Sequence, residues 1–134
     1  TFVQDFRFIQ EIAQAENVFV VIDGKVKALY REPLSALMDS GNVYTVEATE
    51  ENKTVFEALA VIDELVKLKS KRNTKLVVIG GGITQDICCF VSSVLYRGID
   101  WYFIPTTLLP QTDSCIGSKS STNYHHYKNL IGTF

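Results

Sequence analysis

The feature that most constrains the fold of this chain is an alternation of short apolar runs with segments of helical periodicity. The apolar runs cover residues 17–22, 43–46, 75–79 and 101–104, and each has the length of a strand. This β-α-β order predicts parallel strands joined by right-handed crossovers, with helices on both faces of the sheet. The third run is apolar at successive positions, which is typical of a strand covered on both sides. We therefore predict an α/β fold built on one parallel sheet.

The clearest helix is expected over residues 54–70, where apolar residues recur at helical spacing from Val55 to Val66. The pattern Thr54-x-x-Glu57 is a capping box, in which the threonine side chain accepts a hydrogen bond from the first turn. Lysine and arginine side chains follow its last turn, where cations stabilise the helix dipole.

Further helices are predicted over residues 33–39 and 83–97, each ended by a glycine, and over apolar positions spaced helically between residues 2 and 13. The pair Asp23-Gly24 predicts a turn after the first strand. Beyond Pro105 the chain is polar, so we expect loops there, with one short helical segment near residues 108–114.

Composition excludes several classes of protein. The 134 residues are 46% hydrophobic and 21% charged, which predicts one globular domain with a real core. A net charge of −2 gives no basic field for nucleic acid or acidic membranes. No apolar run approaches the roughly 18 residues of a membrane helix. Three cysteines, two of them adjacent, do not form a disulfide framework, so we expect a cytoplasmic protein.

Three glycines, Gly80–Gly82, lie between the third strand and a helix. Without side chains there, a ligand can approach the backbone, and the N-terminus of the next helix presents free N–H groups. This arrangement suits a pyrophosphate, and Asp86, one turn later, can accept hydrogen bonds from ribose hydroxyls. The spacing is not G-x-G-x-x-G, and a plain tight turn with Asp86 beside the helix dipole is the alternative.

Five motifs occur in order from Gly80 onward: GGGITQD at 80–86, YRG at 96–98, PTTLL at 105–109, DSCIGSK at 113–119 and KNLIG at 128–132. Together they resemble the 3-dehydroquinate synthase family and, more broadly, the sugar phosphate cyclase superfamily. Upstream the resemblance is weaker and rests on Asp23 and the Glu50-x-x-Lys53 spacing.

The resemblance implies an NAD- and metal-dependent phosphorus-oxygen lyase that converts 3-deoxy-arabino-heptulosonate 7-phosphate to 3-dehydroquinate and phosphate, a step of the shikimate pathway of aromatic amino acid biosynthesis. It also implies a Rossmann-like N-terminal NAD-binding domain followed by a helical domain with the ligands for zinc or cobalt. We expect residues 1–134 to be the first domain only, without a metal site and inactive alone, in an enzyme that is a homodimer when complete.

The resemblance also implies roles for individual residues. The residues expected to contact NAD are Asp23, Glu50 and Lys53 on the adenosine half, Gly81, Gly82 and Ile83 at the pyrophosphate, Asp86 on the nicotinamide side, and Thr106, Thr107 and Lys128. The residues expected in the pocket for the sugar phosphate are Arg97, Asp113, Lys119 and Asn129. Taken singly, each has a structural alternative, such as a helix-end cation for Arg97 or a solvated loop for both lysines.

Some positions depart from the family pattern. Gln85 replaces a small residue, Pro110 interrupts the leucine-rich helix, Ser118 replaces a glycine, and SSTNYHHY precedes KNLIG. These changes keep open a paralogous cyclase with another sugar phosphate. A non-catalytic nucleotide-binding domain and an iron-dependent alcohol dehydrogenase are further alternatives. The adjacent His125 and His126 are not expected to chelate a metal, and Cys115 has no partner pattern for a nucleophile.

Overall fold

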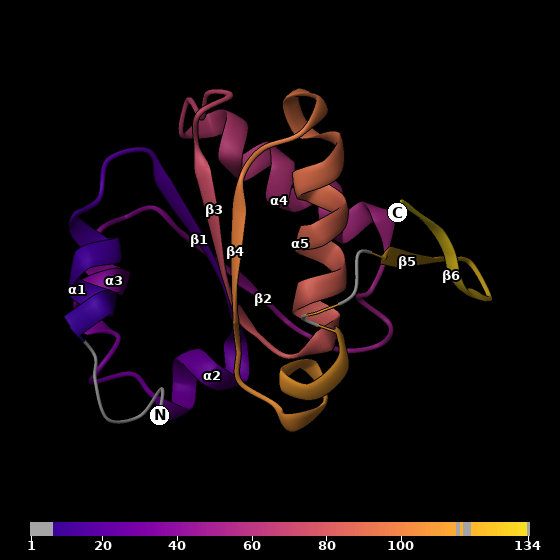
Figure 1. Ribbon diagram of the computed structural model, residues 1–134, viewed down its shortest axis with the longest axis horizontal. Helices are drawn as coiled ribbons and strands as arrows, with labels where there is room; N and C mark the ends of the chain where they lie inside the picture. Colours follow the sequence, from indigo (N-terminus) through magenta and orange to yellow (C-terminus); the bar gives the residue numbers. More distant parts are fainter. Residues whose placement is uncertain (1–6, 115, 117–118, 134) are drawn as a thin grey trace.

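The computed structural model describes residues 7–114, 116 and 119–133 (Figure 1). Its centre is a four-stranded sheet in the order β2-β1-β3-β4, and every neighbouring pair is parallel. The predicted α/β fold is therefore confirmed. The strands are β1 (Val18–Asp23), β2 (Val43–Val46), β3 (Lys75–Gly80) and β4 (Trp101–Pro105).

Helices cover both faces of this sheet (Figure 1). One face carries α1 (Arg7–Gln14), α2 (Gly24–Leu29) and α3 (Ser35–Asp39), and the other carries α4 (Val55–Lys67) and α5 (Gly82–Val94). A short 3-10 turn, η1 (Leu95–Arg97), follows α5, and a π-helical turn, η2 (Pro110–Ser114), follows β4.

The alternation of side chains along the strands builds two cores. On β1, Val20 and Ile22 face α1–α3, whereas Phe19 and Val21 face α4 and α5. All four are at most 3% exposed. Burying an aliphatic side chain of this size contributes about 1.5–3 kcal/mol, so the two covered faces are what hold the sheet and its helices together.

The ends of the helices test the sequence predictions in detail. Thr54 Oγ1 accepts a hydrogen bond from Glu57 N at 3.2 Å, which confirms the predicted cap of α4. The helix predicted to run to Arg97 ends at Val94 instead, because Tyr96 and Arg97 have positive φ angles of 51° and 65°. These left-handed residues turn the chain toward β4.

Two elements differ from the sequence predictions. Asp23-Gly24 is not an isolated turn, since the Asp23 carboxylate accepts a hydrogen bond from Lys25 N at 2.7 Å and caps α2. The polar segment near the C-terminus is not a loop either. It is an antiparallel hairpin of β5 (Ser120–Tyr124) and β6 (Tyr127–Thr133).

Polar side chains hold this hairpin together. The hydroxyls of Ser120 and Thr133 lie 2.9 Å apart, and Thr122 Oγ1 donates to the carbonyl of Ile131 at 3.0 Å. The hairpin packs beside α5, and Asn123 forms an isolated parallel bridge with Thr54 at the start of α4 (Figure 1). The hairpin thus lies at the end of the sheet where α4 and α5 begin.

Gly132 allows the two strands of the hairpin to approach closely, because a methyl group there would overlap the backbone carbonyl of Ser120. We expect Gly132→Ala to lower the free energy of unfolding by about 1–3 kcal/mol and to speed amide exchange in 120–133. Gly24→Ala is the control, since its added methyl finds only ordinary contacts at 3.6 Å. Urea unfolding and amide exchange measure both, and equal stability of Gly132→Ala and wild type would contradict this packing.

Candidate functional site

The parallel strands all end at one side of the molecule, which we call the carboxyl edge. There β1 and β3 end side by side, since a Cβ atom at Gly80 would lie 3.2 Å from the Cβ of Asp23. The same atom would lie 2.7 Å from Thr84 Oγ1, so only glycine fits the sharp turn from β3 to α5. In parallel α/β sheets this edge is the usual place for a ligand.

The N-terminus of α5 is open at this edge. Its N-cap residue is Gly81, and no described side chain caps the first turn. The first turn of the helix therefore presents N–H groups and the positive end of the helix dipole. Beside it, at the end of β4, Thr106 Oγ1 is buried without a hydrogen-bond partner among the described residues. Thr107 Oγ1 lies close as well, 3.3 Å from where a Cβ of Gly81 would stand.

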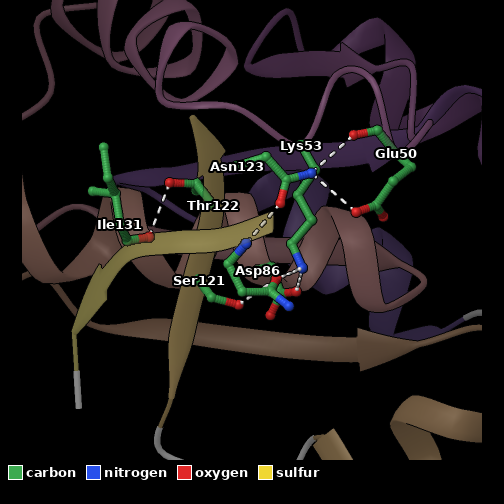
Figure 2. Close-up of polar contacts among 8 residues, drawn as sticks. Glu50, Lys53, Asp86, Ser121, Thr122, Asn123 and Ile131 are labelled. Atoms are coloured by element: carbon green, nitrogen blue, oxygen red, sulfur yellow. Dashed lines mark hydrogen bonds and ion pairs between the residues drawn. The ribbon is translucent and has the colours of Figure 1, made fainter. Parts of the chain in front are cut away.

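A buried ion pair lies one turn further along α5. Lys53 Nζ contacts Asp86 Oδ2 at 2.5 Å and donates a hydrogen bond to Asn129 Oδ1 at 2.8 Å. The Lys53 side chain is only 9% exposed and that of Asp86 24%. Three distant segments, the loop before α4, helix α5 and strand β6, therefore meet at one ammonium group (Figure 2).

Asn123 extends this cluster to Glu50. Its Nδ2 donates to Glu50 Oε1 at 2.9 Å and to the Glu50 carbonyl at 3.2 Å, and its Oδ1 accepts from Asn129 N at 2.9 Å (Figure 2). We call Glu50, Lys53, Asp86, Asn123 and Asn129 the polar network.

Burial changes the acidity of the carboxyl group in this network. It raises the pKa of Asp86 above its ordinary value, and the nearby Glu50 charge adds to the effect. The Lys53 ammonium opposes this through its hydrogen bond and its charge without cancelling it. Burial, followed by the Asp86 charge, likewise raises the pKa of the Cys89 thiol, so that thiol is protonated at neutral pH.

Two hollows flank the network. One, of about 370 Å³, lies at the ends of β1 and β2 and is lined by Asp23, Thr45 and residues 46–49. The other, of about 390 Å³, lies against the hairpin and is lined by Lys119 and Asn129 together with Ser120, Ser121, Leu130, Gly132 and Thr133. The first fits a cofactor-sized group near Asp23, and the second has the cationic and amide groups that bind an anionic ligand.

The structure gathers most of the residues that the sequence singled out. Gly81, Gly82, Ile83, Thr106 and Thr107 lie together where β3 and β4 end. Glu50, Lys53, Asp86 and Asn129 meet in the polar network. Lys53, expected on the adenosine half of the cofactor, contacts Asp86 and Asn129.

Three predicted residues lie outside the glycine turn, the polar network and these two hollows. Arg97 follows α5, a helix of 13 residues that is about 20 Å long, so it lies at the opposite edge of the sheet from Gly82. Within this chain it therefore does not join the other residues expected in the sugar phosphate pocket. Asp113 is exposed on η2, and Lys128 lines a separate hollow with Glu50 and Glu51. Cys115 and Ser118 lie outside the described residues.

Asn123 is the functional candidate that the sequence analysis missed. It is a polar residue only 8% exposed, within a segment that we expected to be a loop. Thr122 and Asn123 are both buried, and the pairing of β5 with β6 shifts register between Thr122 and Tyr124. The strand therefore lacks the regular alternation by which a sequence reveals a half-buried strand.

The described residues do not fit a metal ion. Within ranges 7–114, 116 and 119–133, no three His, Cys, Asp or Glu side chains lie close enough together to hold one. His125 and His126 are exposed at the turn between β5 and β6. No helix in the described part of the chain is long and apolar enough to cross a membrane.

Comparisons with known sequences agree on one family. A family model described as "3-dehydroquinate synthase N-terminal" matches residues 43–134. The 3-dehydroquinate synthase of Clostridium tetani is 36% identical over 126 residues, which are 92% of this chain and 34% of that protein. That of Pyrococcus abyssi is 40% identical over 120 residues, 88% of this chain and 36% of the relative. The chain thus spans about a third of the length of these curated relatives.

Solved structures share the fold. A 2-epi-5-epi-valiolone synthase from Streptomyces hygroscopicus subsp. jinggangensis 5008, with NAD+ and Zn2+ bound, is 29% identical with a TM-score of 0.78. The match covers 95% of this chain and 38% of that one. A 2-deoxy-scyllo-inosose synthase matches 96% of this chain and 39% of its own with a TM-score of 0.79, and at 21% identity it supports the fold alone.

The Lys53–Asp86 pair leads to a pH-dependent prediction. Lys53→Met leaves the Asp86 carboxyl without its cation, so its pKa rises further in the folded state. At pH 7 folding must then bury an unpaired carboxylate, and we expect a loss of about 2–4 kcal/mol. Below about pH 4 the carboxyl is protonated in both states, so that loss shrinks.

Lys67→Met is the matched control. It removes a Lys67–Glu64 pair at 2.5 Å whose side chains are 68% and 35% exposed, and it should cost less than about 1 kcal/mol at either pH. Urea unfolding of both variants at pH 4 and pH 7 makes the comparison. A Lys53→Met penalty that is the same at both pH values would contradict the ionised pair.

Proposed function

The chain belongs to the 3-dehydroquinate synthase family, and from this premise we propose that it is the NAD-binding domain of a sugar phosphate cyclase. One observation carries the proposal. The glycine turn at the open N-terminus of α5 and the polar network lie at the same carboxyl edge. A dinucleotide needs both an anion site for its pyrophosphate and carboxylates for its ribose hydroxyls.

Each part of the cofactor would meet a group with suitable chemistry. The N–H groups of Gly82 and Ile83, with the unpartnered Thr106 hydroxyl, would bind the pyrophosphate. The hollow beside Asp23 would take the adenosine half, and Glu50, which follows its lining residue Thr49 in the chain, would accept hydrogen bonds from ribose hydroxyls. Gly81 and Thr107 would complete the turn around the pyrophosphate. Asp86 would lie toward the nicotinamide, and Lys128 would lie near cofactor and substrate.

We propose that the reaction is the conversion of 3-deoxy-arabino-heptulosonate 7-phosphate to 3-dehydroquinate and phosphate. NAD supplies reversible oxidation of a ring hydroxyl, which acidifies the neighbouring C–H bond before phosphate leaves. Lys119 and Asn129 line the hollow by the hairpin, where an ammonium and an amide would hold the anionic substrate. Asp113 would join this pocket, and Lys53 would hold Asn129 and Asp86 in fixed positions between cofactor and substrate.

A second candidate is a cyclase that acts on another sugar phosphate. The similarity to a 2-epi-5-epi-valiolone synthase at 29% identity favours it. In either case we propose that the chain is the N-terminal part of a longer two-domain enzyme, with the zinc or cobalt ligands in the rest. A homodimeric enzyme and a cytoplasmic location stay predictions.

Calorimetry tests the cofactor site. The chain should bind NAD with a dissociation constant between about 1 µM and 1 mM, because the carboxyl edge is open on one side. Glu50→Gln should weaken NAD binding about tenfold and narrow the preference for NAD over NADP, since the carboxylate repels a 2′-phosphate. Glu32→Gln, an exposed glutamate between α2 and α3, is the control. Equal binding of NAD and NADP by the wild-type chain would remove Glu50 from the site.

An assay of phosphate release tests whether this chain is inactive without the rest of the proposed enzyme. With NAD, the heptulosonate phosphate and added zinc or cobalt, the 134-residue chain should release no phosphate above the uncatalysed rate, because its described residues offer no metal cluster. An enzyme of the relatives' length from the same family serves as the positive control. Turnover by the chain alone would show that the metal ligands, or a metal-free route, lie within it.

A further inference from the structure

Asn123 is nearly buried, and both polar atoms of its side chain form hydrogen bonds. The side chain donates twice to Glu50 and accepts from Asn129 N, and the backbone N donates to the carbonyl of Lys53 at 2.7 Å. The residue is 8% exposed, and its partners come from two segments, the loop before α4 and strand β6. Asn123 thus links Glu50, Lys53 and Asn129 through hydrogen bonds.

We propose that Asn123 is a positioning residue that fixes Glu50 on the cofactor side and Asn129 on the substrate side in one arrangement. The proposal rests on the proposed NAD site, and it assigns Asn123 no contact with either ligand. Figure 2 shows Asn123 beside Glu50, with the two hydrogen bonds that its amide donates to that residue.

The first step of the argument concerns Glu50. The Glu50 side chain has several rotatable bonds, so ordering it against a ribose costs conformational entropy at the moment of binding. The bond from Asn123 Nδ2 to Glu50 Oε1 at 2.9 Å orders the carboxylate beforehand and leaves its other oxygen for a ligand. Without Asn123, the Glu50 side chain would lose its conformational entropy only when the ligand binds. This cost would weaken its binding to a ribose.

The second step concerns Asn129. Its φ angle of 54° is left-handed, a conformation that needs support from its surroundings. Asn123 Oδ1 supplies it by accepting from Asn129 N at 2.9 Å. The Asn129 side chain is then placed to accept from Lys53 Nζ at 2.8 Å and from Ser121 Oγ at 3.1 Å. Asn123 therefore also sets the geometry around the Lys53 ammonium.

The third step is the residue type. The position needs a donor toward a carboxylate and an acceptor toward a backbone N–H, which a neutral amide provides in one side chain. An aspartate at this position would keep the acceptor but would place a carboxylate 2.9 Å from that of Glu50. Two carboxylates so close share one proton, and the pKa of the pair rises.

NAD binding by the variants tests the proposal. Asn123→Ala should weaken NAD binding about tenfold and narrow the preference for NAD over NADP, as Glu50→Gln does. Ser92→Ala is the matched control, because Ser92 is also nearly buried and its hydroxyl donates to the Cys89 carbonyl near the far end of α5, away from the carboxyl edge. That control should bind NAD like wild type, and thermal unfolding is recorded for every variant.

Asn123→Asp keeps the shape of the side chain and adds a readout that a purely structural role would not move. Its NAD affinity should be low at pH 8 and recover several-fold toward pH 5, where the introduced carboxyl and that of Glu50 hold a proton between them and again make the donor bond. The NAD affinity of wild type is measured at the same pH values and serves as the reference, because other charged groups also face this cluster. These groups are Glu51, Lys53, Asp86, His125, His126 and Lys128.

The outcomes separate the two proposals. Failure of the wild-type chain to bind NAD overturns the proposed function, and the role of Asn123 with it. Binding by wild type together with unchanged affinity, NADP discrimination and pH profile in Asn123→Ala and Asn123→Asp overturns the positioning role alone. A pH-dependent loss in Asn123→Asp, with Ser92→Ala unaffected, supports it.

Discussion

The ion pair between Lys53 and Asp86 is the interaction on which the arrangement of the site depends. An ammonium group that is 9% exposed must have partners, because removing its charge from water costs several kcal/mol. Asp86 and Asn129 supply them, and this need brings the hairpin against α5 and the loop before α4. Such a pair contributes little net stability, so its value to the molecule lies in fixing three segments in one geometry.

The fold was largely predictable from the sequence because its signals are local. The apolar run that ends at Ile79 and the capping box at Thr54 each determine their own element, and both are present as expected. Helix α2 and the hairpin were missed for opposite reasons. Asp23-Gly24 looks the same in a turn and in a helix cap, and the strands of the hairpin are held by polar side chains that carry no hydrophobic period.

The site was predictable only in part, because a sequence motif identifies candidate residues but does not say where the fold brings them in space. The glycine turn and Asp86 lie where their spacing suggests, since both belong to one strand-helix unit. Arg97 belongs to the same stretch of sequence but lies a full helix away, because α5 carries the chain across the sheet. The partnership of Lys53 with Asn129 joins positions 76 residues apart, and no local pattern could reveal it.

That separation also orders events in folding. The pairing of β1 with β2 joins residues 23 apart and that of β1 with β3 residues 57 apart, whereas the bonds from Asn123 to Glu50 close a loop of 73 residues. The partners of the hairpin, on α5 and in the loop before α4, are held in place by the sheet and its helices. We therefore expect the hairpin to dock after the sheet and α5 have formed, so that the core forms before the binding site. Changes in the hairpin should act mainly on how fast the native state opens and hardly on how fast the chain folds.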